Sequence, residues 1–221
     1  MIKQEKITKG IIAVYKPVGV SSFDVIKRLR LITGIRKIGH AGTLDPLARG
    51  VLVVGIGGEA CKSLAENVKK EKEYLAIIKL GQESSTDDKE GAKTIIKYAK
   101  RPELKEIRSI VPKFQGLIFQ TPPIFSAIKV NGQRAYRLAR KGKSFSLKSR
   151  KIEIKQIELL GYEWPNLRLR VITGPGAYIR ALARDIGREL NCGGYLTSLE
   201  RIRVGEFTCE KAKHIYEEKK D

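Results

Sequence analysis

Hydrophobic residues recur along the chain with two different periods, and each period predicts one kind of secondary structure. Short apolar runs and alternating segments rich in Val, Ile and Leu are typical of buried or half-buried strands. They predict strands at 10–17, 51–57, 73–81, 151–164 and 167–173, and an extended segment at 195–207.

Other segments carry apolar residues three and four positions apart, which is the spacing of one helix face. Between Ser21 and Gly34 this spacing begins with a capping box, formed by Ser21 and Asp24, and ends at a glycine. The same spacing predicts helices at 61–68, 102–111 and 177–190. Because helices and strands do not alternate regularly, we expect an α+β fold in which helices flank a mixed, mainly antiparallel sheet.

The segment 121–143 differs in character from the rest of the chain. It contains a Pro-Pro pair, an Asn-Gly dipeptide at 131–132 that is a strong hairpin signal, and then a very basic helical stretch. We expect this segment to form a hairpin and a helix that protrude from the core.

Charge is the strongest compositional signal. The 221 residues include 44 Lys and Arg against 24 Asp and Glu, which gives a net charge of +20 at pH 7. Such an excess favours a polyanionic partner, and a nucleic acid above all. Composition alone leaves two alternatives open, an anionic membrane surface and a lysine-rich surface that is simply solvated.

Several classes of protein are disfavoured by what the sequence lacks. No apolar run is long enough to span a membrane, and the first ten residues lack the apolar stretch of a signal peptide. The three cysteines show neither metal-binding nor disulfide spacing, and no glycine-rich segment matches a nucleotide-binding fingerprint. We therefore expect a cytoplasmic protein that requires no metal, redox cofactor or nucleotide.

The stretch GHAGTLDP (39–46) places a histidine and a carboxylate among small residues. Asp45 precedes a proline, and Asp-Pro is a common turn element, which is the simplest interpretation. Gly39, Gly42 and Gly50, however, would let backbone or a ligand approach closely. A carboxylate in such surroundings is a candidate nucleophile or base.

Four further residues are candidates with two interpretations each. Arg180 is either a solvated arginine on a helix face or the partner that keeps Asp45 ionised. Tyr74 and Tyr178 are either core residues or platforms on which a nucleobase stacks. Lys16 either binds a phosphate or supports a turn.

Six segments, taken together and in order, resemble the TruB family of tRNA pseudouridine synthases. The resemblance runs from about residue 10 to about residue 207, and the block with the GTLDP core is its most specific part. The segments are KPVGVSS, GHAGTLDPLARGVL, KEYLAIIKLGQESSTDD, FQGLIFQTPPIFSAIKVNGQRAYRLARKG, GPGAYIRALARDIGREL and YLTSLERIRVGEF.

The resemblance implies the pseudouridine synthase catalytic fold and an enzyme that isomerises a uridine in the T loop of tRNA, at position 55, to pseudouridine. The uridine must be flipped out of a structured loop to react. The reaction is an isomerisation, so the resemblance implies no metal and no cofactor. The implied partner is the T arm of tRNA, with no membrane and no protein partner, and the implied state is a monomer.

The resemblance also assigns roles to single residues. By the family pattern Asp45 is the catalytic aspartate, Arg180 pairs with it, and Tyr74 stacks on the target base. Tyr178, Leu199 and Lys16 belong to the substrate pocket, and His40 occupies the space that the flipped base leaves. The segment 121–143 matches a thumb-like insertion, whose residues for the RNA backbone are Lys129, Arg134, Arg137, Arg140 and Lys141.

We expect one catalytic domain over residues 1–215 and a charged tail at 216–221. Typical members of the family continue into a small C-terminal RNA-binding domain of the PUA type, and we expect none here.

Three other interpretations compete with a tRNA synthase. An RNA chaperone would use the same basic surface, with Asp45 as a structural turn residue. A related synthase, such as one of the dyskerin-like branch that works with guide RNAs, would modify another RNA. A metal-dependent nuclease would use Asp87 and Asp88, although the polar run 83–91 favours solvated side chains there.

Overall fold

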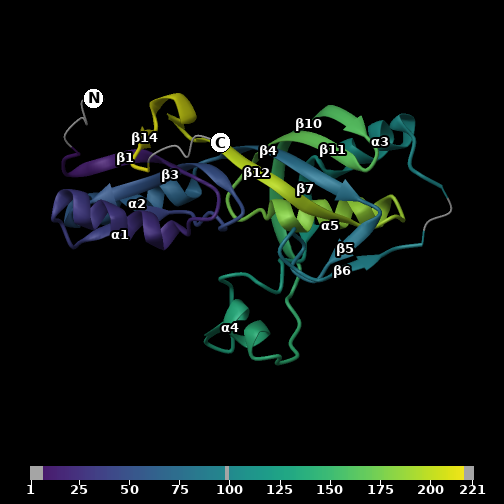
Figure 1. Ribbon diagram of the computed structural model, residues 1–221, viewed down its shortest axis with the longest axis horizontal. Helices are drawn as coiled ribbons and strands as arrows, with labels where there is room; N and C mark the ends of the chain where they lie inside the picture. Colours follow the sequence, from purple (N-terminus) through teal and green to yellow (C-terminus); the bar gives the residue numbers. More distant parts are fainter. Residues whose placement is uncertain (1–6, 98–99, 217–221) are drawn as a thin grey trace. The chain divides into compact units, whose positions relative to one another are not determined.

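The computed structural model describes residues 7–97 and 100–216, and the chain divides into two compact units. Unit 1 comprises Met1–Tyr74 and Leu199–Asp221, and unit 2 comprises Leu75–Ser198. The chain passes from one unit to the other within strands β4 (Lys72–Leu80) and β12 (Gly194–Val204). Figure 1 traces the elements of both units.

Unit 1 is built on strands hydrogen-bonded in the order β14, β1, β3, β12, with β2 on β3 and β13 on β12. β1 runs antiparallel to β3 over its whole length, whereas β14 pairs with β1 and β12 with β3 in parallel. Helices α1 and α2 pack on this sheet (Figure 1). The bounds are β1 Gly10–Lys16, α1 Ser22–Thr33, β2 Ile38–Ala41, β3 Arg49–Ile56, α2 Gly58–Lys69, β13 Phe207–Thr208, η2 Cys209–Lys211 and β14 Lys213–His214.

Helix α1 begins and ends where the sequence predicts. The Ser21 hydroxyl accepts from the Asp24 N–H and the Asp24 carboxylate accepts from the Ser21 N–H, which completes the capping box. Gly34 ends the helix in the left-handed conformation, with φ of 69°. The apolar face between them buries Val25 and Leu29 against the sheet.

Unit 2 has the strand order β12, β4, β11, β10, β7, in which β10 and β11 form a long antiparallel hairpin and β7 pairs with β10. The amphipathic helix α5 buries Ile179, Leu182 and Ile186. The bounds are β5 Gln82–Ser84, β6 Lys93–Ile95, α3 Leu104–Ile110, η1 Val111–Phe114, β7 Gly116–Gln120, β10 Arg150–Glu163, β11 Asn166–Thr173 and α5 Ile179–Glu189.

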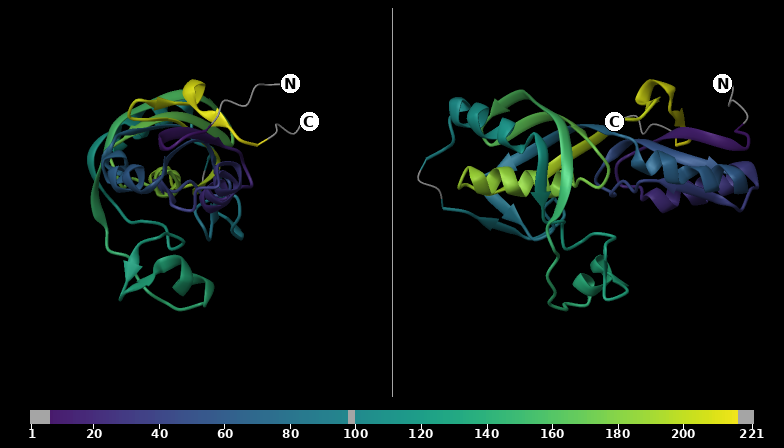
Figure 2. Two further views of the ribbon diagram at one scale, coloured as in Figure 1. Left: turned by 90° about the vertical axis from the view of Figure 1, so that its left-hand side faces the viewer. Right: turned by 180° about the vertical axis from the view of Figure 1, so that it is seen from behind.

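The insertion 121–143 leaves β7 and projects from the sheet of unit 2, as the views of Figure 2 show. It contains a two-residue hairpin, β8 (Lys129–Val130) and β9 (Gln133–Arg134), closed by Asn131 and Gly132, and the short helix α4 (Ala135–Arg140). The predicted hairpin and helix are therefore confirmed.

The α+β class with a mixed sheet is confirmed, and three local differences stand out. Gly39 and His40, which no predicted element included, lie in strand β2, which pairs antiparallel with residues 53–56 of β3. Strand β7 was not predicted, and neither was β14. Residues 217–221 of the expected charged tail lie outside the described residues. Within the described part of the chain, no helix is long and apolar enough to cross a membrane.

Candidate active site

The turn that carries Asp45 is braced by the segment 16–22. The Gly19 N–H donates to the Pro46 carbonyl oxygen at 2.8 Å. The Ser22 hydroxyl donates to the Leu44 carbonyl and accepts from the Leu44 N–H, both at 2.9 Å. Asp45 itself is half-buried, and its carbonyl accepts from the Ala48 N–H at 3.0 Å. The start of α1 thus fixes the backbone on both sides of the candidate carboxylate.

Arg201, on β12, holds the same turn from another side. Its side chain is buried, with 2% of the residue exposed. Nε donates to the Val51 carbonyl at 2.8 Å and Nη2 donates to the Gly42 carbonyl at 2.9 Å. These two acceptors lie after and before Asp45 in the chain, so one guanidinium closes the turn. Sequence reasoning did not single out Arg201.

The glycines around Asp45 make room for protein atoms. A Cβ on Gly50 would lie 2.3 Å from the Arg201 carbonyl oxygen, and Gly50 has a φ of 107°. A Cβ on Gly42 would lie 3.5 Å from Arg201 Nη1, and one on Gly39 would lie 3.3 Å from Leu64. Close approach of the chain itself is therefore confirmed at Gly50. The glycines at 42 and 50 were the sequence signal that could have indicated a buried side chain, that of Arg201, packed against this turn.

Tyr74 is buried beside Arg201, and a side-chain hydrogen bond joins the two residues. Burial raises the pKa of the Tyr74 hydroxyl, and the positive charge of Arg201 opposes that rise. Burial lowers the pKa of Arg201, whereas Tyr74 and the charge of Asp45 oppose this change. Asp45, Tyr74 and Arg201 are therefore electrostatically linked within unit 1.

Two buried lysines add positive charge to the same region. Lys16 Nζ donates to the carbonyls of Pro17 and Val20 at 2.8 and 2.7 Å, so Lys16 does support the turn. Lys72 Nζ donates to two carbonyls at the end of α2, at 2.8 and 2.7 Å. Burial lowers the pKa of each lysine to about 8, and the charge of Asp45 partly offsets this for Lys16.

His40 and Leu199 complete the predicted residues of unit 1. His40 pairs with Val54 on the neighbouring strand β3, and its Nδ1 is buried with no hydrogen-bond partner among the described residues. Burial, followed by the charge of Arg201, lowers the pKa of His40, which keeps its ring neutral at pH 7. Leu199, on β12, is buried, with 7% exposed.

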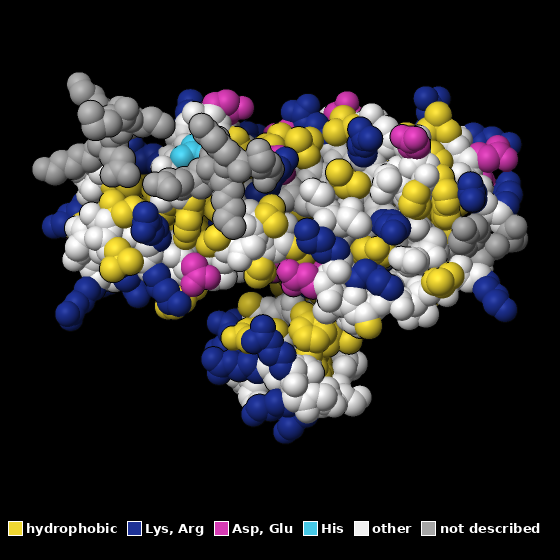
Figure 3. All heavy atoms as spheres, in the orientation of Figure 1, with side chains coloured by type: hydrophobic (Ala, Val, Ile, Leu, Met, Phe, Trp, Pro, Cys, Tyr) yellow, Lys and Arg dark blue, Asp and Glu magenta, His cyan; other side chains and the backbone are white. Residues whose placement is uncertain are grey.

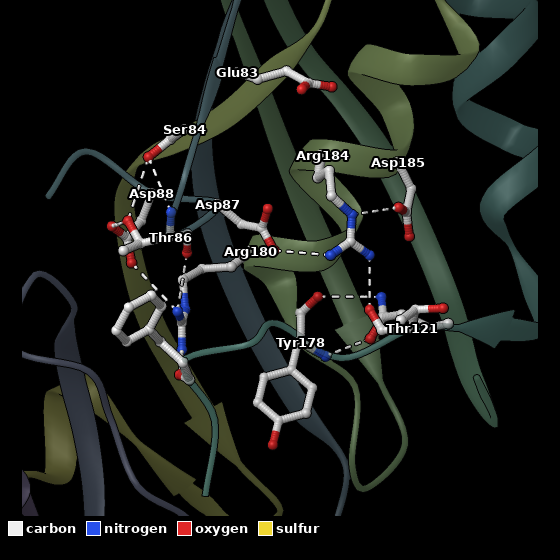
Figure 4. A network of polar contacts seen from close by, with 12 residues as sticks. Glu83, Ser84, Thr86, Asp87, Asp88, Thr121, Tyr178, Arg180, Arg184 and Asp185 are labelled. Atoms are coloured by element: carbon white, nitrogen blue, oxygen red, sulfur yellow. Dashed lines mark hydrogen bonds and ion pairs between the residues drawn. The ribbon is translucent and has the colours of Figure 1, made fainter. Parts of the chain in front are cut away.

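In unit 2, Arg180 is a buried side chain that contacts two other segments, one with Thr86 and Asp88 and one with Phe125 (Figure 4). Nη1 donates to the Thr86 carbonyl at 3.1 Å and lies 3.4 Å from Asp88 Oδ2, and Nη2 donates to the Phe125 carbonyl at 3.0 Å. The reading of Arg180 as a solvated helix residue is therefore wrong. Its predicted pairing with Asp45 joins residues of the two units and stays a prediction.

Asp88 is buried too, with 3% exposed, which corrects the expectation of a solvated loop. It accepts from the Thr86 hydroxyl at 2.5 Å and from the Glu90 N–H at 3.0 Å. The neighbouring Asp87 pairs with Arg184 at 2.8 Å, and Arg188 lies 3.4 Å from Glu83. The acidic run, residues 83–91, thus folds against the basic side of α5. Arginines one turn apart on this helix each face a carboxylate of the run.

No group of three His, Cys, Asp or Glu side chains that could hold a metal ion occurs among residues 7–97 and 100–216. Asp87 and Asp88 are both engaged with arginines of α5. A carboxylate that already neutralises an arginine is a poor metal ligand, so the geometry does not favour the nuclease interpretation.

Tyr178 immediately precedes α5, and its ring is half-buried under a cation. The Arg150 guanidinium lies 5.1 Å from the ring centroid, and Arg150 also donates to the Gly176 carbonyl. The Gln120 side chain contacts the Tyr178 backbone. Arg180 and Tyr178 therefore lie together in unit 2, two residues apart at the start of one helix.

The predicted RNA-backbone residues of the insertion all lie on its surface. Dark blue side chains gather on this part of unit 2 in Figure 3. Arg137 and Arg140 also approach the Tyr136 ring, with 6.0 and 5.6 Å between guanidinium and centroid. The exposed cations are Lys129, Arg134, Arg137, Arg140 and Lys141.

The sequence model of the TruB family pseudouridylate synthase (N terminal domain) matches residues 30–179. This chain belongs to the TruB family. It is 47% identical over 203 residues to tRNA pseudouridine synthase B of Clostridium novyi (strain NT), covering 92% of this chain and 70% of the relative. It is 42% identical to tRNA pseudouridine synthase B of Thermobifida fusca (strain YX), covering 94% of this chain and 73% of the relative.

Two solved structures share the fold. In the crystal structure of a Cbf5-Nop10-Gar1 complex, one chain matches with a TM-score of 0.71 and 28% identity over 93% of this chain. A second match, with a TM-score of 0.69 and 26% identity over 93% of this chain, is the structure of an H/ACA RNP bound to a substrate RNA containing 2'-deoxyuridine. This TruB family chain spans about half the length of the matched chains, 52% and 51%.

Proposed function

We propose that this protein is a tRNA pseudouridine synthase that isomerises the T-loop uridine at position 55, with Asp45 as its essential carboxylate. The observation that carries the proposal is the 47% identity, over 92% of the chain, to a protein named tRNA pseudouridine synthase B. The net charge of +20 agrees with an RNA substrate.

The reaction breaks the bond between C1′ and N1 of uridine, turns the base, and joins C1′ to C5. The C5 proton leaves to solvent and N1 gains a proton, so atoms and electrons balance without an oxidant or reductant. We expect no metal or cofactor to be required. The protein must supply a group that reacts with or deprotonates the nucleoside, and a rigid pocket that holds the flipped base.

Asp45 suits the first task because its turn is fixed on two sides while the residue itself is only half-buried. Asp45 either bonds to the substrate or abstracts a sugar proton. In this proposal, Tyr74, which is buried beside Arg201, stacks on the target base. In the same proposal, Arg180 pairs with Asp45 in the RNA-bound enzyme.

The remaining residues shape the pocket and the RNA path. Tyr178 and Leu199 line the uracil pocket, and neutral His40 fills the place of the flipped base. Lys16 acts by fixing the turn behind Asp45, with its ammonium in the same electrostatic field. The cations of the insertion contact T-arm phosphates, so RNA affinity falls as salt rises.

We further propose that the enzyme acts alone on tRNA, as a monomer in the cytoplasm. The relatives named tRNA pseudouridine synthase B support a stand-alone enzyme, whereas the Cbf5 chain is described in a complex with Nop10 and Gar1. Activity without a guide RNA or a second protein is the property that separates the two cases.

The test is proton release from C5 of a T-arm stem-loop that carries tritium at that position. Without added metal, guide RNA or protein, the wild type should release one equivalent of tritium. Asp45→Asn should lower the rate by more than about 10³-fold, as expected for loss of an essential reacting group. Glu158→Gln, a change at a carboxylate about half exposed on β10, is the matched control and should keep the wild-type rate.

The opposite results would each identify an alternative. RNA binding and refolding without any tritium release would favour an RNA chaperone in which Asp45 is a turn residue. Release that requires a guide RNA would favour the guided branch. Equal rates for wild type and Asp45→Asn would remove Asp45 from the chemistry.

A further inference from the structure

Gln120 is the last residue of β7 and directly precedes the insertion 121–143. It is buried, with 1% exposed. Its Oε1 accepts from the Tyr178 N–H at 2.8 Å, and its Nε2 donates to the Tyr178 carbonyl at 3.2 Å. In Figure 4 the two dashed lines from the Tyr178 backbone mark these bonds. The side-chain amide therefore pairs with both main-chain groups of one residue, as a neighbouring strand would.

This pairing gives the Tyr178 N–H an acceptor that α5 does not supply. Tyr178 is the N-cap residue of α5, with φ of −114° and ψ of 116°, and no side chain caps the helix there. Its N–H has no acceptor within the helix, because the first N–H groups of a helix lack intrahelical partners. Its carbonyl accepts from the Leu182 N–H at 3.1 Å as well as from Gln120. Gln120 thus sets the point at which the chain enters α5.

Two groups consequently place Tyr178. Gln120 holds its backbone, and the Arg150 guanidinium covers its ring at 5.1 Å. Arg180 follows two residues later on the same helix, so a shift of the entry to α5 would also move its guanidinium. Gln120 lies one residue before the insertion and is shielded from solvent, with 1% exposed.

We propose that Gln120 is a positioning residue that sets Tyr178, and through the entry to α5 also Arg180, for turnover. This inference rests on the proposed function, in which Tyr178 lines the uracil pocket. Gln120 touches no substrate in this scheme. Its loss should slow the reaction and leave RNA binding almost unchanged, because the exposed cations that contact phosphates remain.

The first variant is Gln120→Leu, which keeps similar bulk and removes both hydrogen bonds. The single-turnover rate on the T-arm stem-loop should fall by about 10- to 100-fold, the usual result of a small misplacement in an active site. The dissociation constant for the same RNA should change by less than about threefold, since phosphate contacts supply most of the affinity.

The second variant, Gln120→Glu, gives a signature in the pH profile. An ionised Glu accepts from the Tyr178 N–H but repels the Tyr178 carbonyl, whereas a protonated Glu accepts and donates as Gln does. Burial raises the pKa of a carboxyl. The rate of Gln120→Glu relative to wild type should therefore rise as pH falls from about 8 to about 6. The relative rate of Gln120→Leu should stay flat.

A double-mutant cycle shows whether Gln120 acts through Tyr178. In a Tyr178→Ala background, Gln120→Leu should lose the part of its effect that acts through the Tyr178 ring, because coupled residues are not additive. The part that acts through the backbone and Arg180 should remain. Arg184→Met is the matched control: Arg184 donates to the Thr121 carbonyl at 2.7 Å, beside Gln120, and no dashed line in Figure 4 joins it to Tyr178. Its effect should add to that of Tyr178→Ala.

Circular dichroism establishes whether each variant is folded. If Gln120→Leu does not fold, the pH series of Gln120→Glu takes its place as the test. A wild type that forms no pseudouridine would overturn the proposed function. An active wild type with wild-type turnover in Gln120→Leu, or with an equal loss of RNA affinity and rate, would overturn the inference alone. Full additivity with Tyr178→Ala would do the same.

Discussion

The two units bury positive charge in different ways. In unit 1, Lys16, Lys72 and Arg201 donate to main-chain carbonyl oxygens, and Arg201 also bonds to the Tyr74 side chain, which is not a carboxylate. In unit 2, Arg180 and Arg184 bind carbonyls and also face the carboxylates of Asp88 and Asp87. A carbonyl satisfies a donor but does not neutralise its charge, whereas a carboxylate does both.

The difference gives each region its own electrostatics. The carbonyl-bonded cations of unit 1 keep a positive field around the Asp45 turn, and both lysines there have a pKa lowered to about 8. The paired arginines of unit 2 form a network with little net charge (Figure 4). This network joins α5, the acidic run 83–91 and Thr121, the first residue of the insertion. Unit 1 is thus suited to bind or activate an anionic group, and unit 2 to hold a geometry.

The largest effect is expected where a buried ion pair is broken. Arg180→Met leaves the buried Asp88 without its arginine, which should lower the free energy of unfolding by about 3–5 kcal/mol and nearly abolish pseudouridine formation. Urea denaturation measures the first quantity, and tritium release by the folded fraction measures the second.

Arg188→Met is the matched control on the same helix. Arg188 also faces a carboxylate, Glu83, but 60% of its side chain is exposed. Exposed ion pairs contribute little to stability, so the free energy of unfolding of this variant should fall by less than about 1 kcal/mol. The double variant Asp88→Asn with Arg180→Met should recover part of the stability lost by Arg180→Met. Equal losses for Arg180→Met and Arg188→Met would contradict the distinction between buried and exposed pairs.

A smaller loss is expected for Arg201→Met in unit 1. This change leaves the carbonyls of Gly42 and Val51 without the donor that Arg201 supplies. Each buried acceptor left without a donor costs about 1–2 kcal/mol. The free energy of unfolding should therefore fall by about 2–4 kcal/mol. Turnover should fall as well, because the turn that carries Asp45 loosens.

Arg49→Met provides the comparison for Arg201→Met. Arg49 pairs with Glu200, the residue before Arg201, and 51% of its side chain is exposed. Its replacement should change stability by less than about 1 kcal/mol. Wild-type stability and rate in Arg201→Met would show that the Asp45 turn does not depend on the guanidinium.

Local patterns predicted most of the elements but little of the burial. The capping box at Ser21 and the Asn-Gly hairpin at 131–132 act over a few residues, so the sequence determines them directly. Strand β7 escaped because the Gly116–Gln120 segment is short, and only its pairing with β10 makes it a strand. Tertiary pairing of this kind has no local signal.

The same contrast between local patterns and tertiary contacts holds for the residues of the candidate site. The family resemblance assigned roles to Asp45, Tyr74 and Arg180. The sequence did not predict a role for Arg201 or Gln120. An arginine or glutamine in a strand looks solvated, since such residues are mostly exposed. Their burial follows from carbonyl and N–H groups that distant segments bring to them. Even Gly50, flagged for close approach, did not reveal that its neighbour would be the backbone of Arg201.

The smallest effect concerns the pH dependence of unit 1. Lys16 and Lys72 have a folded pKa of about 8 because burial disfavours their charge, against an ordinary value of 10.5. Above pH 8 the unfolded chain therefore binds more protons than the folded one, and stability rises with pH. Each lysine should add up to about 1 kcal/mol of unfolding free energy between about pH 8 and pH 9.

The window ends near pH 9 because other groups then act in the opposite direction. Burial raises the pKa of Cys209 to about 11 and that of Tyr15 to about 12, so both keep protons in the folded state that the unfolded chain has lost. Urea denaturation at pH 7.5, 8.5 and 9 measures the slope, and Lys16→Met with Lys72→Met should flatten it. An unfolding free energy that falls from pH 8 to pH 9 in the wild type, or a slope that persists in the double variant, would mean that the carbonyl-bonded lysines of unit 1 are no more easily deprotonated than exposed ones.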